Sequence, residues 1–196
     1  KYVQFQADFN EEVRGKLSTY IEAPKIEGQV NKDNAAQFIY FRAGALQWDA
    51  RELYKKYFDE NTGLAKDRAV LFPDQAAGSA LTGKSKSEAE QWAKDMGLSV
   101  EHCVRQLPDG KYIVQIDTVP LKTIVDGLSG EGGNICTQVY DSWHQLFEAQ
   151  AEDISKSTQA LAQQYSHAIS VYDNLQKILS ALIDACLAVA RDCLKP

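Results

Sequence analysis

The stretch YDSWHQLFEAQAEDISKSTQALAQQYSHAISVYDNLQKILSALIDACLAVARDC, residues 140–193, decides the fold of this chain. Alternating steps of four and three residues from Tyr140 meet an apolar or aromatic side chain everywhere except at His144 and Thr158. The positions are Tyr140, His144, Phe147, Ala151, Ile154, Thr158, Leu161, Tyr165, Ala168, Tyr172, Leu175, Leu179, Leu182, Cys186, Val189 and Cys193. A seam sustained over about seven heptads is typical of a coiled coil.

This seam predicts one continuous helix over residues 137–196. Thr137 is suited to cap its start, and neither Gly nor Pro interrupts residues 134–195. At a rise of about 1.5 Å per residue, such a helix is about 85 Å long.

A second amphipathic helix is predicted over residues 1–23, and Pro24 ends it. Its apolar face is formed by Tyr2, Phe5, Phe9, Val13, Leu17 and Tyr20. If the two helices are antiparallel, Tyr20 lies near Tyr140 and Tyr2 lies near Thr158. The shorter helix, about 33 Å long, then leaves the seam from Leu161 to Cys193 without a partner in this chain.

A bare apolar seam of this length must be covered by residues that precede Lys1, by a second copy or by another protein. The sequence starts at Lys1 inside an amphipathic pattern and shows no secretory signal. We therefore expect it to be a piece of a longer chain, with any native targeting signal upstream of Lys1.

A compact mixed α/β segment is predicted between the helices, over residues 24–136. Its elements are a strand at 37–42, a helix at 46–58, a loop at 60–86, a helix with a capping box at Ser87 and Glu90 that stops at Gly97, a β-hairpin of 100–107 with 111–117, a helix from Pro120 to Leu128, and a flexible link at 130–133. The fold class is therefore α+β: a long antiparallel coiled coil with an inserted small mixed α/β domain that contains a β-hairpin. The domain boundaries are 1–23, 24–136 and 137–196.

One motif raises the question of nucleotide binding. The stretch GSALTGKS, residues 78–85, matches the phosphate-loop pattern, which needs a buried strand before Gly78 and a helix that opens at Lys84. The sequence offers only three strand-like residues, 70–72, and places the helix cap at Ser87. Tyr112 to Asp117 resembles a magnesium-binding strand, but it belongs to the predicted hairpin. We therefore predict a mobile surface loop without a nucleotide.

No other pattern indicates catalysis, a metal or a cofactor. His102 and Cys103 are neighbours on a predicted strand, so they point to opposite faces and do not form a nucleophile–base pair. Asp8, Glu11 and Glu12 are predicted to be solvated charges on the outer face of the first helix. His144 is interpreted as a packed seam residue, with a pH-sensitive core role as the alternative.

Composition narrows the function further. There are 27 acidic and 21 basic residues, and the net charge of −6 argues against nucleic-acid binding. No apolar run reaches the length of a membrane span. Cys103, Cys136, Cys186 and Cys193 form no C-x-x-C pair and are predicted to be free thiols. We predict a protein that is not an enzyme.

Residues 164–180, QYSHAISVYDNLQKILS, carry a specific resemblance. They are similar to the pattern K-Y-S-x-A-N-S-x-Y-D-N-L-x-K-x-L-S of the invasin-type needle-tip proteins of type III secretion systems, the IpaD, SipD and BipD group. The upstream residues that extend the match are Gln91, Trp92, Gly97, Gly110, Tyr112, Val114, Ile116, Pro120 and Trp143. The resemblance covers about residues 1–190.

The sequence departs from the family pattern in several places. Gln164 and Ile169 replace a Lys and an Asn, and the loop through GSALTGKS looks longer than usual. The self-chaperoning helical hairpin that precedes the first coil helix in this family does not fall within residues 1–196, and neither does the upstream part of that helix.

The resemblance implies a protein made in the bacterial cytoplasm and secreted to the needle tip on the cell surface. There it assembles as a pentamer, holds back secretion until host contact and supports the pore-forming translocators. The implied partners are the needle protomer, the translocators, other copies of the chain and bile salts. Contact with the host membrane runs only through the translocators.

We expect the needle contact on the helix from Tyr172 to Lys195. Asp173, Asn174 and Lys177 are the expected polar contacts, and Leu175, Leu179 and Leu182 supply apolar surface. The alternative is that Tyr172, Leu175, Leu179 and Leu182 only hold an intramolecular coil. A bile-salt groove is expected between the coil and the mixed domain, with Tyr20, Tyr40 and Tyr140 as its aromatics.

Two other functions compete with the needle-tip interpretation. One is a generic coiled-coil scaffold or adaptor, which co-sedimentation with needles would separate from a tip protein. The other, more remote, is a phosphate-loop nucleotide-binding protein, which titration with a labelled nucleotide and magnesium would reveal.

Overall fold

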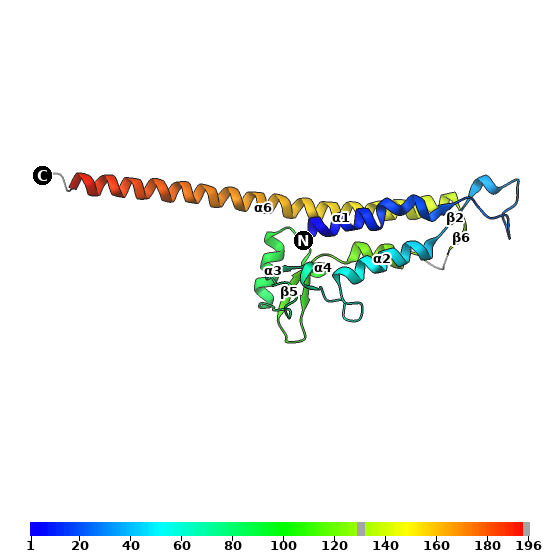
Figure 1. Cartoon of the computed structure of the whole chain (residues 1–196), viewed down its shortest axis with the longest axis horizontal. Coiled ribbons are helices and arrows are strands. Elements are labelled where there is room, and N and C mark those ends of the chain that lie inside the picture. Colours follow the sequence, from blue (N-terminus) through cyan, green and yellow to red (C-terminus); the bar gives the residue numbers. More distant parts are fainter. Residues whose placement is uncertain (129–131, 194–196) are drawn as a thin grey trace.

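A single long helix dominates the computed structural model, which describes residues 1–128 and 132–193, the last three as backbone only. Helix α6, Thr137–Cys193, runs for 57 residues without a break and is about 85 Å long. Figure 1 shows the other elements gathered beside its first half, while its second half projects alone. The predicted α+β class with one long C-terminal helix is confirmed.

The remaining helices are α1 Tyr2–Glu12, α2 Ala43–Tyr57, α3 Lys86–Asp95, α4 Val100–Cys103 and α5 Val119–Asp126, with 3₁₀ turns η1 Arg14–Tyr20, η2 Ala35–Gln37 and η3 Asp67–Ala69. The strands are β1 Ile21–Glu22, β2 Phe38–Phe41, β3 Val70–Phe72, β4 Val104–Gln106, β5 Tyr112–Gln115 and β6 Gly133–Cys136. They form two antiparallel sheets, β1-β2-β6 and β3-β5-β4.

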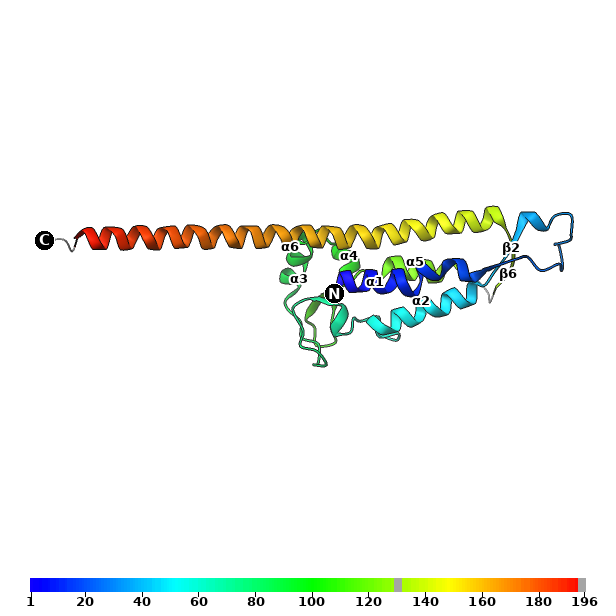
Figure 2. The ribbon, with the colours of Figure 1, turned by 45° about the horizontal axis from the view of Figure 1, so that its top comes forward.

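Helix α1 runs antiparallel along the first half of α6, as the seam predicts (Figure 2). The ring of Phe9 stacks on that of Phe147 at 5.9 Å between centroids, and Arg14 pairs with Glu148 at 2.6 Å. On its other side α1 packs on α2, where Phe5 meets the Tyr57 ring edge-on at 5.1 Å. The first helix is therefore covered from two sides.

The predicted helix over residues 1–23 is wrong in its second half. Helix α1 ends at Glu12, the backbone of Val13 leaves the helical region (φ −121°, ψ −66°), and η1 and β1 follow. A Cβ on Gly15 would lie 2.8 Å from the Asn10 carbonyl oxygen, so this tight turn needs glycine. Leu17 and Tyr20 stay buried, because the tighter turns still face the core.

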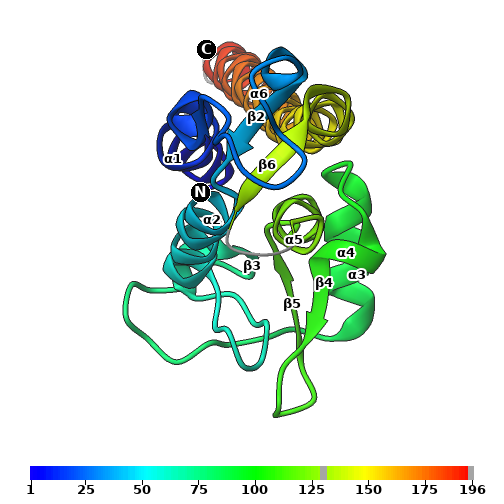
Figure 3. The same ribbon diagram turned by 90° about the vertical axis from the view of Figure 1, so that its right-hand side faces the viewer.

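The first sheet joins the start of α6 to the rest of the molecule (Figure 3). Its centre is the predicted strand β2, with β1 on one edge and β6 on the other. Sequence analysis missed β1, and it placed Gly133 in the flexible link at 130–133, although Gly133 begins β6. Gly130 and Glu131 of that link lie outside the described residues. Strand β6 is short and half-buried, so its pairing with a distant strand leaves no local pattern.

An aromatic cluster links this sheet to the coil. The buried Phe41 of β2 lies 5.3 Å from the Tyr140 ring and 5.0 Å from that of Trp143. Trp143 in turn lies 5.4 Å from Phe147, the residue that stacks on Phe9. These ring contacts pack the first turns of α6 against both the first sheet and α1.

The second sheet and α3 lie beside the middle of α6. The β4–β5 hairpin is confirmed, with Leu107 N–H donating to the Lys111 carbonyl at 2.7 Å and Gly110 at φ +83° in the turn. Helix α3 stops before Gly97, whose φ of +71° favours glycine, as predicted. Helices α2 and α5 also form where the apolar spacing predicts them.

Three local predictions are wrong here. Residues 60–86 are not all loop, because 70–72 form β3. Residues 100–103 are helical turn α4, which Ser99 caps by accepting the His102 N–H. The capping box of α3 is Ser85 with Glu88, two residues earlier than predicted.

We predict that Phe147→Ala destabilises the chain by about 3–5 kcal/mol, because the fully buried ring contacts α1 and Trp143. Chemical denaturation measures the change. The matched control is Tyr165→Ala on the same helix, where the side chain is 69% exposed and the expected change is under about 0.5 kcal/mol. Equal effects of the two variants would contradict the packing described here.

Candidate assembly surface

The second half of α6 carries a bare apolar face. Every residue from 162 to 190 is exposed, whereas Ile154 and Thr158 one or two turns earlier are buried. The exposed large apolar side chains are Tyr165, Ile169, Val171, Tyr172, Leu175, Ile178, Leu179, Leu182, Ile183, Leu187 and Val189. The predicted bare seam is therefore present up to residue 190, where the described side chains of α6 end. Cys193 and Lys195 lie beyond that point.

The cover of α6 ends at the small module, residues 67–115, which comprises η3, the second sheet, α3 and α4. Gly97, just after α3, approaches Ala160 so closely that a Cβ there would lie 3.8 Å from the alanine methyl group. Leu161 is half-buried against the core, and no other described element lies on α6 beyond it. The cover of α6 therefore ends at Leu161.

The bare face is wider than the seam that sequence analysis counted. With Tyr165 at heptad position a, Ile169 and Ile183 fall at e, and Val171 and Ile178 fall at g. Two-stranded coiled coils usually place Glu and Lys there. Counting only the a and d positions missed these residues, although reading the flanking positions would have found them. The width favours contact with more than one helix.

The residues expected to bind the needle all lie on this bare stretch. Tyr172, Leu175, Leu179 and Leu182 occupy a and d positions, and each is 56–61% exposed. The Gln176 side-chain amide donates to the Tyr172 hydroxyl at 2.9 Å.

The three polar candidates are exposed as well, but they do not share one side of the helix. Asp173 at b flanks one edge of the apolar face, Asn174 at c flanks the other edge, and Lys177 at f points away from it. A single partner helix on the seam can therefore reach Asp173 or Asn174 more easily than Lys177.

The three tyrosines expected in a bile-salt groove have separate surroundings. Tyr20 is buried and donates its hydroxyl to Asp49, and burial together with this carboxylate raises the pKa of Tyr20. Tyr40 lies under the Lys25 ammonium, 3.8 Å from the ring centre, and Tyr140 stacks on His144 at 5.7 Å. None of them lines the main cavities of the described residues.

The GSALTGKS loop lacks the setting of a phosphate loop. The strand before it, β3, lies in an antiparallel sheet, and the backbones of Lys84 and Tyr112 exchange two hydrogen bonds at 2.8 Å. Gly78 N–H already donates to the Asp67 carboxylate at 2.9 Å. The expectation that no helix opens beside Lys84 is wrong, since Ser85 caps α3. However, the Glu88 carboxylate accepts the Ser85 N–H at 3.1 Å. The negative charge at the N-terminus of α3 therefore comes from Glu88 and not from a phosphate.

The His102–Cys103 pair is also arranged differently from the prediction, because it lies in a helical turn and not in a strand. His102 Nδ1 lies 3.1 Å from an Asp117 carboxylate oxygen. Cys103 is buried, and burial raises the pKa of its thiol to about 12, so the thiol stays protonated near neutral pH. Cys136 and Cys186 are free, like Cys103.

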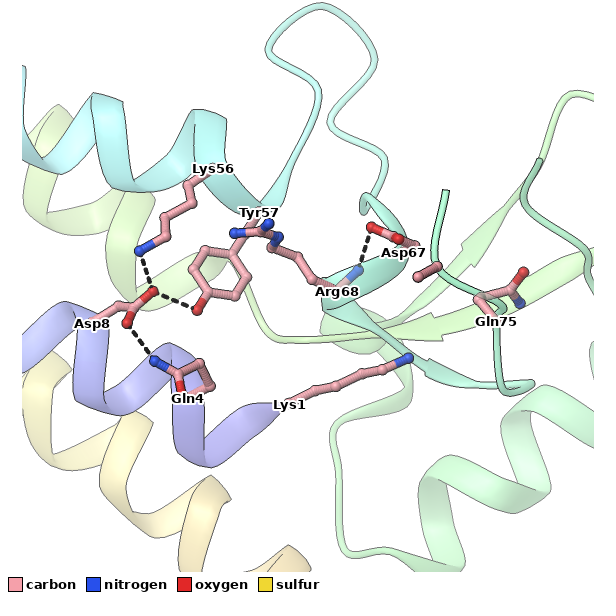
Figure 4. Close-up of a pocket in the computed structure, with 9 residues that line it drawn as sticks. Lys1, Gln4, Asp8, Lys56, Tyr57, Asp67, Arg68 and Gln75 are labelled. Carbon is pink, nitrogen blue, oxygen red and sulfur yellow. Dashed lines mark hydrogen bonds and ion pairs between the residues drawn. The ribbon is translucent and has the colours of Figure 1, made fainter. Parts of the chain in front are cut away.

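Asp8 is the main polar residue that sequence analysis misplaced, since it is buried and not solvated (Figure 4). It accepts hydrogen bonds from Gln4 at 2.7 Å, Tyr57 at 2.8 Å and Lys56 at 2.5 Å. Burial would raise the pKa of Asp8, but these donors outweigh it and hold the pKa below its usual value. The error arose because α2 covers a second face of α1, the one that carries Asp8, while Val3 and Glu11 stay exposed.

Within the described residues there is no cluster of His, Cys, Asp and Glu that could hold a metal ion, and no helix long and apolar enough to cross a membrane. A rod that is covered along one half by an antiparallel helix and that continues the same apolar seam along the other half defines a coiled-coil protein. Comparison with known proteins identifies the family. Residues 1–194 match the model of type III secretion systems tip complex components, and the chain belongs to that family.

Curated relatives agree with this assignment. The chain is 34% identical to the cell invasion protein SipD of Salmonella typhi over 175 residues, which cover 87% of this chain and 49% of that protein. It is 31% identical to the invasin IpaD of Shigella flexneri over 157 residues, 78% of this chain and 42% of that protein. The chain therefore spans about half the length of the curated relatives it matches.

Solved structures show the same fold. A pathogenicity island 1 effector protein from Chromobacterium violaceum matches with a TM-score of 0.66 at 34% identity, over 76% of this chain and 46% of that one. BipD of Burkholderia pseudomallei, a type III secretion component, matches with a TM-score of 0.61 at 22% identity, over 96% and 56%.

We predict that Asp8→Asn destabilises the chain by about 2 kcal/mol at neutral pH, because an amide cannot replace the carboxylate for Lys56 and Tyr57. Because folding lowers the pKa of Asp8, its stabilisation is present above about 3.8, the ordinary Asp value, and is lost as the pH falls below it. Urea denaturation between pH 3 and pH 7 should show the two proteins converging at low pH. The control Asp153→Asn, at an exposed site, should match wild type, and a constant gap across the pH range would refute this role.

Proposed function

We propose that this chain caps the needle of a type III secretion system through the bare half of α6, as a structural protein and not as an enzyme. Membership of the tip complex family is the observation that carries this proposal. The exposed apolar face of residues 162–190 supports it, because an apolar surface of that extent indicates a protein partner. The needle protomer is the proposed partner.

The remaining parts of the proposed role follow from the family. The assembled tip, formed from several copies as a pentamer, holds back secretion until host contact and supports the translocators. The protein is made in the bacterial cytoplasm and acts outside the cell at the needle end. The small module lies beside the middle of α6 and away from its bare C-terminal end, which suits a module that faces the host while the rod holds the needle.

The intramolecular alternative stays open for the seam itself. A relative twice as long has further residues that could lie on Tyr172, Leu175, Leu179 and Leu182. The wide apolar face favours both contacts together, since the a and d positions can hold one helix while e and g positions contact another.

We predict that Leu179→Ser lowers co-sedimentation with purified needles at least about tenfold, because it removes apolar surface at the centre of the bare face. Asp173→Ala should weaken binding less, and Lys177→Ala least. The melting temperature of this chain should stay unchanged, because all three side chains are exposed.

The matched control is Val3→Ser on α1, which removes an apolar side chain that is 65% exposed away from the bare face. A stable Leu179→Ser variant that sediments like wild type would refute the needle contact. If a full-length version loses stability but not needle binding, the seam holds only an intramolecular coil. If wild type itself does not sediment, the generic scaffold is the better interpretation.

Bile-salt sensing at Tyr20, Tyr40 and Tyr140 remains part of the proposal. We predict that Tyr140→Ala weakens the binding of deoxycholate, used below its micelle concentration, at least about fivefold, because the ring offers apolar contact beside Phe41. Calorimetric titration measures this, with Tyr165→Ala on bare α6 as the control. Saturable binding that Tyr140→Ala leaves unchanged would place the bile-salt site elsewhere.

A further inference from the structure

The bare face of α6, residues 162–190, is apolar at the positions that flank its seam as well as on the seam itself. With Tyr165 at heptad position a, none of the a, d, e and g positions from 162 to 190 carries a charged residue. A partner helix with the usual Glu and Lys at its own e and g positions would bring those charges against Ile169, Val171 or Ile178. The face therefore fits a partner whose flanking positions are equally apolar, and a second copy of this chain provides one.

Helix α1 decides in which direction a second helix can run along this seam. It covers α6 as far as Thr158, and its N-terminal end, at Tyr2, points toward the bare half (Figure 2). A second α6 that ran parallel to the first would place its own residues 140–158 where α1 already lies. A second α6 that runs antiparallel instead continues the line of α1, and it keeps the covered halves of the two copies at opposite ends of the pair.

The antiparallel arrangement has a register that covers the whole bare seam. In such a pair, an a position of one helix lies opposite a d position of the other. The first exposed seam residue is Tyr165, and the last one with a described side chain is Val189. Pairing these two across the copies puts Leu179 opposite Leu175, on either side of a two-fold axis. The remaining seam pairs are Tyr172 with Leu182 and Cys186 with Ala168.

A shift of this register by one heptad loses contact in either direction. A shift toward the small module brings Val189 of the second copy against Thr158, which is already buried. A shift the other way leaves Tyr165 beyond the end of the second α6 at Cys193. The length of the bare stretch therefore favours a single register.

We propose that two copies of this chain pair through residues 162–190 of α6, antiparallel and about a two-fold axis near Lys177. The pair covers the seam and the flanking apolar positions of both bare faces when no needle is present. It uses the surface proposed to bind the needle, so the two copies must separate before a needle binds. The pairing does not depend on the needle contact, and its test contains no needles.

Sedimentation equilibrium of the whole chain in reducing buffer tests the pairing. We expect a mass near twice the 21.8 kDa of the chain at about 100 µM and the monomer mass at about 0.5 µM, because association depends on concentration. Leu175→Glu puts a carboxylate against Leu179 of the second copy and should stay monomeric at both concentrations. The matched control Ser170→Glu adds the same group at position f, which points away from the seam, and should pair like wild type.

The native thiol of Cys186, which is free and exposed, reports the orientation of the two helices. Because Cys186 lies opposite Ala168 in the antiparallel register, the two Cys186 thiols are about 27 Å apart along the pair, and oxidised wild type should form no bond between them. Ala168→Cys places a thiol opposite Cys186 of the second copy. Mild oxidation should then link positions 168 and 186 across the copies, as identified by peptide mass spectrometry, whereas the control Ser170→Cys should give no such link.

The proposal is overturned if the chain stays monomeric at about 100 µM, which would leave the needle or residues that precede Lys1 to cover the face. A mass above that of two copies would also overturn it. So would a disulfide between two Cys186 thiols in wild type, which a parallel pair would form, or equal pairing by Leu175→Glu and Ser170→Glu.

Discussion

The antiparallel packing of α1 on the first half of α6, centred on Phe9 and Phe147, is the contact on which the rest of the structure depends. It fixes which part of the long helix is covered. On the same helix, Phe5 and Asp8 attach α2, and through α2 the small module takes its place beside the middle of the rod. The contact ends near Thr158, and the bare surface begins a turn later because nothing described continues α1 along the seam.

This arrangement separates two tasks along one helix. The covered half is held by aromatic packing and by a sheet whose strands β2 and β6 come from distant parts of the chain, so it is well placed to act as a rigid support. The bare half has large apolar side chains at five of the seven heptad positions and few charges, so it is suited to close contact with other helices. Both properties suit the role proposed for this chain at a needle tip.

Much of this could be predicted from the sequence, because helical periodicity is a local signal. The spacing from Tyr140 to Val189 predicted the rod, and the antiparallel length mismatch predicted the bare end. What failed depends on distant contacts: β6 forms only because β2 lies beside it, and Asp8 is buried only because α2 covers a second face of α1. The tight turn at Val13 and the cap at Ser85 depend on backbone geometry that the apolar spacing does not encode. The candidate needle residues were found on the seam, whereas Ile169 and Val171 beside it were missed.

The central claim is that the bare half of α6 exists to be covered by a partner. Hydrogen exchange of the backbone amides along α6, measured on the dilute chain alone and on the chain bound to needles, tests it most directly. The account predicts slow exchange at residues 140–158 in both samples, and fast exchange at 162–190 that becomes slow on needles. Exchange at 162–190 that is already slow in the free chain, or that needles leave unchanged, would contradict it.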